Sequence, residues 1–249
     1  RPRRFLPVCI MSLKLRLRAA SLELRFQISC RESLWPLMAP FSWSRTRRFR
    51  ARSESVPEEG RVHRGLALVI DGFPGSANSF ATRAFRAMQE ERVPVGNHYH
   101  SPAETIRATR LGVPVLLTLR RPIDSVNSMV RRWPFVSFES ALRWYVMFYE
   151  AVEPHLDRMV LSDFGTTTSE FPTVVAALNQ KFGTSFGTSL PAERMAEFEP
   201  RLRQSEDERQ RRAAEKREME CAYLRSASES RRKAAEAIFG RLAHRSLGD

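Results

Sequence analysis

The segment DGFPGSANSF, residues 71–80, places a glycine, hydroxyls and an amide directly behind the apolar run LALVI. Gly75 lets the backbone approach an anion closely, and the start of a helix after the turn attracts negative charge. The expected donors are the amides of Ala77, Asn78 and Ser79 and the side chains of Ser76, Asn78 and Ser79. The turn holds no lysine, so it does not match the Walker phosphate loop. It predicts an anion site formed by backbone amides and hydroxyls.

Two further polar segments follow apolar runs later in the chain. Arg120 and Arg121 come directly after VPVLLTL, and Ser128 lies one to two helical turns beyond them. A guanidinium binds a phosphate in fork geometry while a hydroxyl donates to it, so this segment predicts a second phosphate site. The third segment is HYHSP, residues 98–102, where a histidine can act as a general base because its unperturbed pKa is close to neutrality.

These segments need a scaffold that brings them together, and the hydrophobic pattern supplies one. We expect strands at 66–71, 93–100, 113–120 and 158–164, and helices at 78–91, 102–112, 121–132, 137–155 and 169–182. Strands that alternate with helices favour a mainly parallel sheet covered by helices on both faces, a three-layer α/β sandwich. Ligands of such sheets bind at the carboxyl ends of the strands. All three polar segments are therefore expected at the same edge.

Taken together, the three segments resemble the sulfotransferases that use 3′-phosphoadenosine 5′-phosphosulfate (PAPS), a branch of the P-loop NTPase-like fold. Their 5′-phosphosulfate loop reads approximately P-[KR]-S-[GA]-[TN]-[ST]-[WF], and this chain has Pro74, Gly75, Ser76, Ala77, Asn78, Ser79 and Phe80. Their 3′-phosphate motif is matched in register by Arg120, Pro122, Asp124 and Ser128. Their catalytic histidine followed by x-P is matched by His100, Ser101 and Pro102. The resemblance covers about residues 65–186.

The resemblance implies a sulfotransferase that moves the sulfuryl group of PAPS to a hydroxyl or amine of a carbohydrate, a lipid or a small alcohol. His100 would be the general base, and Arg120 and Ser128 would hold the 3′-phosphate. The residues implied to hold the 5′-phosphosulfate are Pro74, Gly75, Ser76, Ala77, Asn78 and Ser79. No metal is implied. Gly75 stands where the family usually has Lys or Arg, which favours the alternative of a degenerate, non-catalytic nucleotide-binding member. A P-loop kinase-like phosphotransferase is a second alternative, against which the missing Walker lysine counts. A third is a protein whose basic arm associates with RNA or an anionic membrane.

Charge divides the chain into three parts. The net charge is +13, and residues 1–52 alone carry +11 because they hold 13 basic side chains and only two acidic ones. We therefore expect residues 1–60 to be a disordered basic arm, a targeting segment or a spurious extension. Residues 61–190 form the α/β domain. Residues 191–249 form a charged helical extension whose helices, over about 201–234, are expected to be solvated.

The remaining composition limits the classes of function. Cys9, Cys30 and Cys221 have no metal-ligand or disulfide-framework spacing. No apolar run reaches the roughly 18 residues of a membrane span. No recognition motif accompanies the basic arm, so we expect no specific nucleic-acid partner. The cytoplasm is the expected location, with an N-terminal targeting signal as the alternative because FLPVCIMSL, residues 5–13, lies between basic residues.

Overall fold

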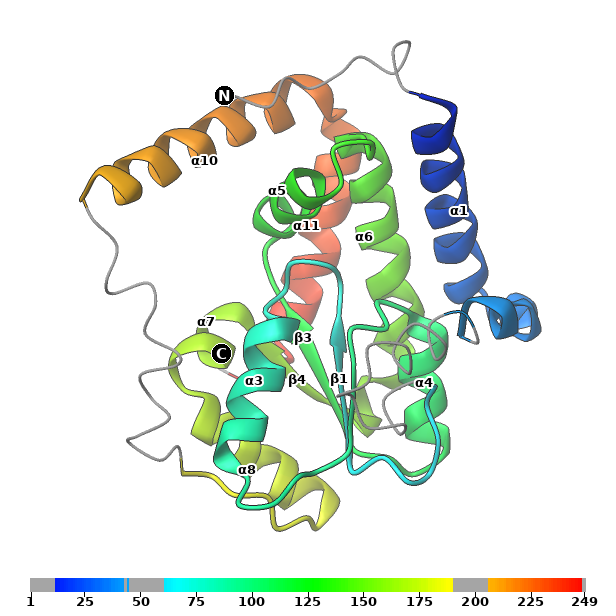
Figure 1. The fold of residues 1–249 in the computed structure, drawn as a ribbon, viewed down its shortest axis with the longest axis vertical. Coiled ribbons are helices and arrows are strands. Elements are labelled where there is room, and N and C mark those ends of the chain that lie inside the picture. The colour runs from blue at the N-terminus through cyan, green and yellow to red at the C-terminus, as the bar shows by residue number, and fades with distance from the viewer. Residues whose placement is uncertain (1–11, 43, 45–60, 190–205, 248–249) are drawn as a thin grey trace.

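The computed structural model describes residues 12–42, 44, 61–189 and 206–247. Within these residues the centre of the molecule is a four-stranded parallel sheet. Its strands are β1 (Leu68–Gly72), β2 (Val95–Asn97), β3 (Val115–Leu119) and β4 (Val160–Asp163). They lie in the order β2-β1-β3-β4, and Figure 1 shows the sheet with helices on either side. The predicted parallel sheet is confirmed.

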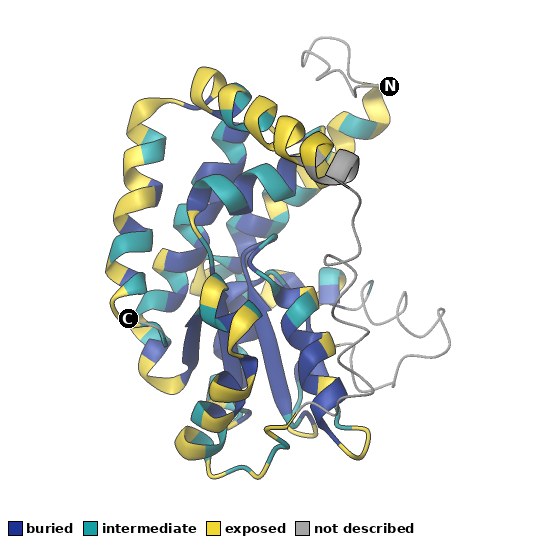
Figure 2. Ribbon diagram, turned by 90° about the vertical axis from the view of Figure 1, so that its left-hand side faces the viewer, coloured by how far each residue is buried: buried dark blue, intermediate teal, exposed yellow. Residues whose placement is uncertain are grey.

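The strands bury both faces of the sheet, and their side chains alternate between two apolar clusters. Leu68 and Ile70 belong to one cluster, whose helical residues come from α3 (Asn78–Met88) and α8 (Phe171–Phe182). Val69 belongs to the other cluster. The helices of this second layer are α4 (Pro102–Arg110), α5 (Pro122–Arg132), α6 (Phe138–Val152) and α11 (Glu229–Ala243). The buried strands between two helical layers (Figure 2) form the expected three-layer α/β arrangement.

Local signals in the sequence explain where several helices begin and end. Pro102 and Pro122 occupy the first turns of α4 and α5, where a missing backbone N–H costs nothing. Ser137 caps α6 by accepting a hydrogen bond of 3.1 Å from the amide of Ser140. Gly183 ends α8 in the left-handed conformation. These signals act between near neighbours in the chain, and the sequence predicted these four helix boundaries to within a few residues.

The second strand is shorter than predicted. We expected a strand over residues 93–100, but β2 ends at Asn97. His98 and His100 have φ values of 53° and 47°, in the left-handed region that an extended strand excludes. The prediction was therefore wrong for residues 93–94 and for residues 98–100, and the last three residues turn away at the edge of the sheet.

The segment after β4 also differs from the prediction. We expected one helix over residues 169–182, but a short helix, α7 (Phe164–Ser169), precedes α8. Asp163 caps α7 by accepting hydrogen bonds of 2.7 Å and 3.2 Å from the amides of Gly165 and Thr166. This cap starts the helix immediately at the end of β4 and places Phe164 at the carboxyl edge of the sheet.

Part of the N-terminal arm is ordered, which corrects the expectation of disorder for the described residues. Helix α1 (Leu13–Ser29) and the 3-10 helix η2 (Glu32–Met38) lie along the outside of the second layer (Figure 1). Phe26 is 2% exposed and stacks on Trp144 of α6 with ring centroids 4.8 Å apart. Glu23 accepts hydrogen bonds from Arg143 and from the Trp144 indole. Residues 1–11 and 45–60 lie outside the described residues.

The C-terminal extension is also part of the fold. The expectation of solvated helices fits much of α10 (Glu206–Ser226), which is exposed along most of its described surface. It is wrong for the end of α10 and the residue that follows it, because Tyr223 and Ala227 are buried in the core. Beyond residue 234, α11 buries Ala235, Ile238 and Leu242 in the same core. Beyond α11, the amide of Leu247 donates to the carbonyl of Leu161 in β4 at 2.9 Å. Three ion pairs add to this docking: Arg231 with Glu139, Arg241 with Glu153, and Arg245 with Asp157.

Candidate functional site

The candidate site lies at the carboxyl ends of the strands, and its first part is the turn between β1 and α3. Gly75 and Ala77 have φ values of 92° and 81°. The amide of Ser76 donates to the carbonyl of Phe73, which closes the turn, and α3 begins at Asn78. Successive residues that alternate between right-handed and left-handed backbone conformations direct their N–H groups into a concavity that binds anions. The first amides of a helix also have no acceptor within the helix. The turn and the start of α3 together can therefore bind an anion through the backbone.

The side chains of Ser76 and Asn78 point into the protein rather than toward solvent. The Ser76 hydroxyl donates to the carbonyl of Phe73 at 2.6 Å and lies 2.8 Å from the hydroxyl of Thr118 in β3. The Asn78 amide donates to the Gly72 carbonyl at 3.1 Å, and its oxygen accepts from Thr118 at 2.6 Å. We expected both side chains to be ligand donors, but here they brace the turn against the neighbouring strand.

Thr118 was missed in the sequence because it stands within an apolar strand. It is fully buried and joins the Ser76 and Asn78 side chains to β3. The signal that could have identified Thr118 is a single hydroxyl within an otherwise apolar strand, because buried polar groups in native proteins have hydrogen-bond partners. Ser79, in contrast, is exposed, and its hydroxyl lies 3.4 Å from Nε2 of His98.

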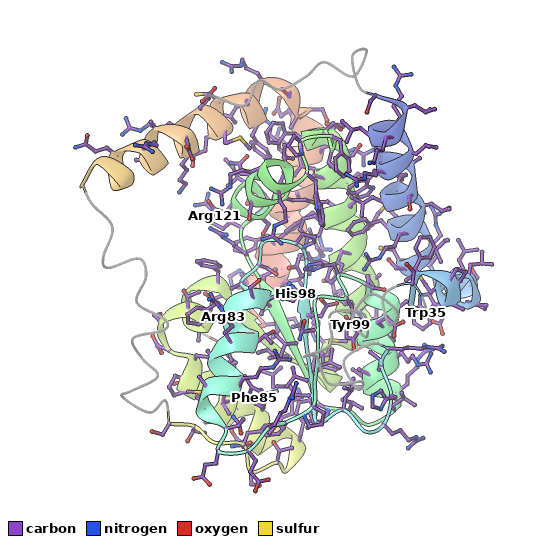
Figure 3. All side chains as sticks on the ribbon, viewed as in Figure 1. Trp35, Arg83, Phe85, His98, Tyr99 and Arg121 are labelled. Carbon is purple, nitrogen blue, oxygen red and sulfur yellow. The ribbon has the colours of Figure 1, made fainter. Side chains whose placement is uncertain are left out.

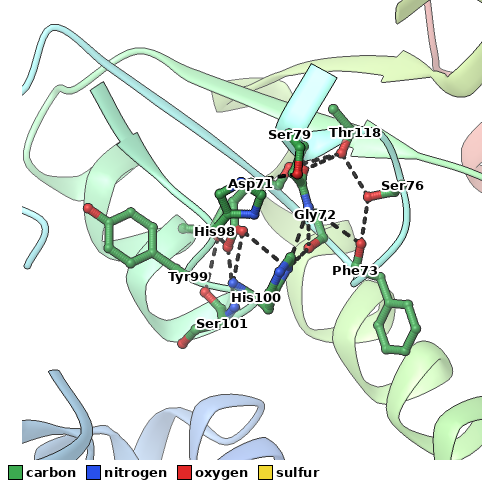
Figure 4. A network of polar contacts seen from close by, with 12 residues as sticks. Asp71, Gly72, Phe73, Ser76, Ser79, His98, Tyr99, His100, Ser101 and Thr118 are labelled. Atoms are coloured by element: carbon green, nitrogen blue, oxygen red, sulfur yellow. Dashed lines mark hydrogen bonds and ion pairs between the residues drawn. The ribbon is translucent and has the colours of Figure 1, made fainter. Parts of the chain in front are cut away.

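His100 lies beside this turn in a defined orientation (Figure 4). Its Nδ1 is 2.8 Å from the carbonyl oxygen of Gly72, and because a carbonyl only accepts, this geometry assigns the proton of a neutral ring to Nδ1. Nε2 then keeps its lone pair. An imidazole held in this way can accept a proton through Nε2, which is the orientation that a general base requires.

Asp71 holds the turn that carries His100. This side chain at the end of β1 is fully buried, and its carboxylate accepts from the amides of His100 and Ser101 at 2.8 Å and 3.2 Å and from the Thr105 hydroxyl at 3.0 Å. Burial raises the pKa of Asp71 above its ordinary value, against the opposing effect of these hydrogen bonds. Asp71 was not among the site residues predicted from the sequence. Its signal is a carboxylate at the end of an apolar run, a position that is costly unless donors surround it.

Arg120 joins the second polar segment to the turn. Its Nη1 donates to the carbonyl of Gly75 at 2.9 Å, and its guanidinium carbon lies 3.9 Å from the ring centroid of Phe164. The hydroxyl of Tyr145 in α6 donates to the Arg120 carbonyl at 2.8 Å. The turn after β1 and Phe164 at the end of β4 therefore hold the guanidinium, and Tyr145 of α6 holds the backbone of Arg120.

Ser128 also lies against the turn. A Cβ atom at Gly75 would be 2.8 Å from the Cβ of Ser128 and 2.9 Å from the carbonyl oxygen of Ser125. Helix α5 therefore packs so closely on the turn that Gly75 has no room for a side chain. This contact gives a structural reason for glycine where the resembled family usually has Lys or Arg.

The structure thus brings the predicted residues together at one edge of the sheet. The carboxyl ends of β1, β2 and β3 are surrounded by the turn of residues 74–79 together with His100, Arg120 and Ser128. Figure 3 shows His98, Arg83 and Arg121 at this same end. Among the described residues, no group of three or more His, Cys, Asp or Glu side chains is placed to hold a metal ion.

Comparison of the chain with protein-family models, with curated proteins and with solved structures found no match in any of the three.

Proposed function

We propose that this protein binds PAPS and transfers its sulfuryl group to a hydroxyl or amine, with His100 as the general base. The observation that carries the proposal is the convergence of separate segments on one turn. Nδ1 of His100 is 2.8 Å from the Gly72 carbonyl, and Nη1 of Arg120 is 2.9 Å from the Gly75 carbonyl. A base and a guanidinium at opposite ends of an anion-binding turn are the groups that sulfuryl transfer needs.

In this mechanism Nε2 of His100 takes the proton of the acceptor as the acceptor oxygen or nitrogen attacks sulfur. The new bond to sulfur forms while the bond from sulfur to the bridging oxygen breaks, and that oxygen leaves on the 5′-phosphate of the nucleotide. Amides of the turn and the N-terminus of α3 stabilise the charge that develops there. Arg120 and Ser128 hold the 3′-phosphate, which ATP lacks.

One observation favours the alternative of a non-catalytic nucleotide-binding protein. Gly75 supplies no cation, and the close contact with Ser125 and Ser128 leaves no space for one at that position. The arrangement of the backbone amides supports anion binding in either case. The two functions differ in transfer alone, so donor binding and transfer need separate measurements.

Donor binding can be measured by isothermal titration calorimetry with 3′-phosphoadenosine 5′-phosphate. Removing Arg120 as Arg120→Ala is expected to weaken binding at least tenfold, because a charge-assisted hydrogen bond contributes about 1.5–3 kcal/mol. Arg131→Ala, which removes the same charge at an exposed position near the end of α5, is the matched control and is expected to change binding less than threefold. His100→Gln is expected to bind the nucleotide normally but to transfer no sulfuryl group.

The outcomes separate the alternatives. No binding by the folded protein would overturn the proposal. Equal binding of ATP would favour a kinase-like phosphotransferase. Nucleotide binding without transfer of radiolabelled sulfuryl group from PAPS to any member of a panel of carbohydrate, lipid and alcohol acceptors would favour the non-catalytic protein.

A further inference from the structure

Helix α1 carries a row of leucines on its outer side. Leu13, Leu17 and Leu24 are 74%, 62% and 54% exposed. Leu17 and Leu24 follow Leu13 by four and eleven residues, close to one and three turns of an α-helix, so the three side chains lie in one row about 16 Å long. Leu37 of the adjacent η2 is 55% exposed as well. Four of the five exposed large apolar side chains recorded for the described residues therefore belong to this one segment.

The row is not needed for folding, because α1 attaches to the body of the protein by its opposite side. Phe26 stacks on Trp144, and Leu22 packs against the same core. The guanidinium of Arg25 donates to the carbonyl of Tyr99. Helix α1 thus has an apolar inner side in the core and a second apolar side that is exposed. The helix lies at the edge of the molecule (Figure 1).

Basic side chains flank the leucine row on both sides. By helical geometry Lys14 and Arg18 lie on one side of it and Arg16 on the other, and all three are exposed. The acidic residues of this segment are engaged elsewhere: Glu23 pairs with Arg143 of α6 at 2.5 Å, and Glu32 pairs with Arg110 of α4 at 2.6 Å. The outer face of α1, formed by Leu13, Lys14, Arg16, Leu17, Arg18 and Leu24, is therefore apolar along its middle and positive along its edges.

We propose that this outer face of α1 docks on the surface of an anionic lipid bilayer. Leucines can enter the boundary between headgroups and acyl chains while the flanking Lys and Arg side chains bind lipid phosphates. None of the described helices has the length and apolar composition to cross a bilayer, so the contact is one of a helix lying on the surface. A second copy of this chain is a poorer occupant. In a twofold dimer the same cations would face each other and repel.

The proposal is tested by sedimentation of the full chain with vesicles of phosphatidylcholine alone or with phosphatidylglycerol added. Binding is expected to the anionic vesicles only, and to weaken as salt rises. Replacing Leu13, Leu17 and Leu24 together by serine is expected to weaken binding at least tenfold, as is replacing Lys14, Arg16 and Arg18 by glutamine. Leu224→Ser is the matched control, because Leu224 of α10 is 53% exposed but lies outside this face. It is expected to bind like the unmodified protein.

Circular dichroism of each variant confirms that it folds, and the substituted side chains are exposed, so the fold is expected to persist. Failure of the unmodified protein to bind anionic vesicles at low salt would overturn the proposal. So would equal binding by the leucine variant, which would assign the attraction to other basic residues. A dimer in light scattering that the leucine variant abolishes would assign the face to self-association instead. None of these outcomes depends on PAPS binding, so the result is independent of the proposed function.

Discussion

Replacing Gly75 by lysine, the residue type usual at this position in the resembled family, is expected to destabilise the protein by about 2–6 kcal/mol rather than to improve donor binding. Two costs add at this position. The φ of 92° is strained for any residue with a side chain, which costs about 1–3 kcal/mol. The new Cβ would lie 2.8 Å from Ser128 and 2.9 Å from the Ser125 carbonyl, so α5 would have to shift, at a cost of about 1–3 kcal/mol. Urea denaturation measures the loss.

Two alanine variants separate these costs. Gly75→Ala is expected to lose nearly as much stability as Gly75→Lys, because the first side-chain carbon already makes the contact. Gly183→Ala is the matched control: Gly183 has a φ of 65°, but no atom lies within 4 Å of its would-be Cβ, so only backbone strain of about 1 kcal/mol is expected. If Gly75→Lys is as stable as the unmodified protein and binds the nucleotide more tightly, the packing of α5 on the turn is wrong.

Replacing Asp71 by alanine is expected to cost about 3–5 kcal/mol of stability and to abolish transfer. The buried amides of His100 and Ser101 would lose their acceptor, at about 1–3 kcal/mol each, and a cavity would form at the end of β1. The left-handed turn at His98 and His100 would relax, and His100 would lose its fixed orientation. Thermal and urea unfolding give the stability change, and two-dimensional nitrogen–proton spectra of the histidine rings report whether Nδ1 of His100 still carries the proton.

Asp71→Asn is the conservative substitution to compare with Asp71→Ala. Thr105→Val is the control for the hydrogen bond that the Thr105 hydroxyl donates to Asp71. Asparagine keeps the volume and one acceptor oxygen, so the expected loss is about half of that for alanine. Thr105→Val is expected to cost about 1 kcal/mol, because both amide contacts of Asp71 remain. An Asp71→Ala protein with unchanged stability and an unchanged His100 ring spectrum would show that the carboxylate does not position His100.

The difference in stability between the unmodified protein and Asp71→Asn is expected to depend on pH, and the pKa of Asp71 gives its direction. Burial raises the pKa of Asp71 above 3.8, so the folded protein holds this proton more tightly than the unfolded chain does. The stability contributed by the proton is fully present below pH 3.8 and is lost as the pH rises through the raised pKa. The stability of the unmodified protein relative to Asp71→Asn is therefore expected to fall as the pH increases across this window, and a difference that grows with pH would contradict the cause given for the shift.

The sequence predicted the features that depend on near neighbours in the chain. Alternation of apolar runs with helical patterns predicted the parallel sheet and its two helical layers, and Pro102, Pro122 and Gly183 marked helix ends. It also predicted that the turn after β1, the segment after β2 and the segment after β3 share one edge, because parallel strands that return through helices must end on the same side.

Only the tertiary structure decided which groups touch at that edge and which side chains remain available to a ligand. Ser76 and Asn78 turn inward to Thr118, Asp71 reaches the backbone of His100, and Arg120 rests on Phe164 from the end of another strand. The docking of α1 and α11 on α6 was likewise decided by tertiary packing. Periodicity and capping act within a few residues, whereas these contacts join residues dozens of positions apart, so they depend on the path of the whole chain rather than on any local pattern.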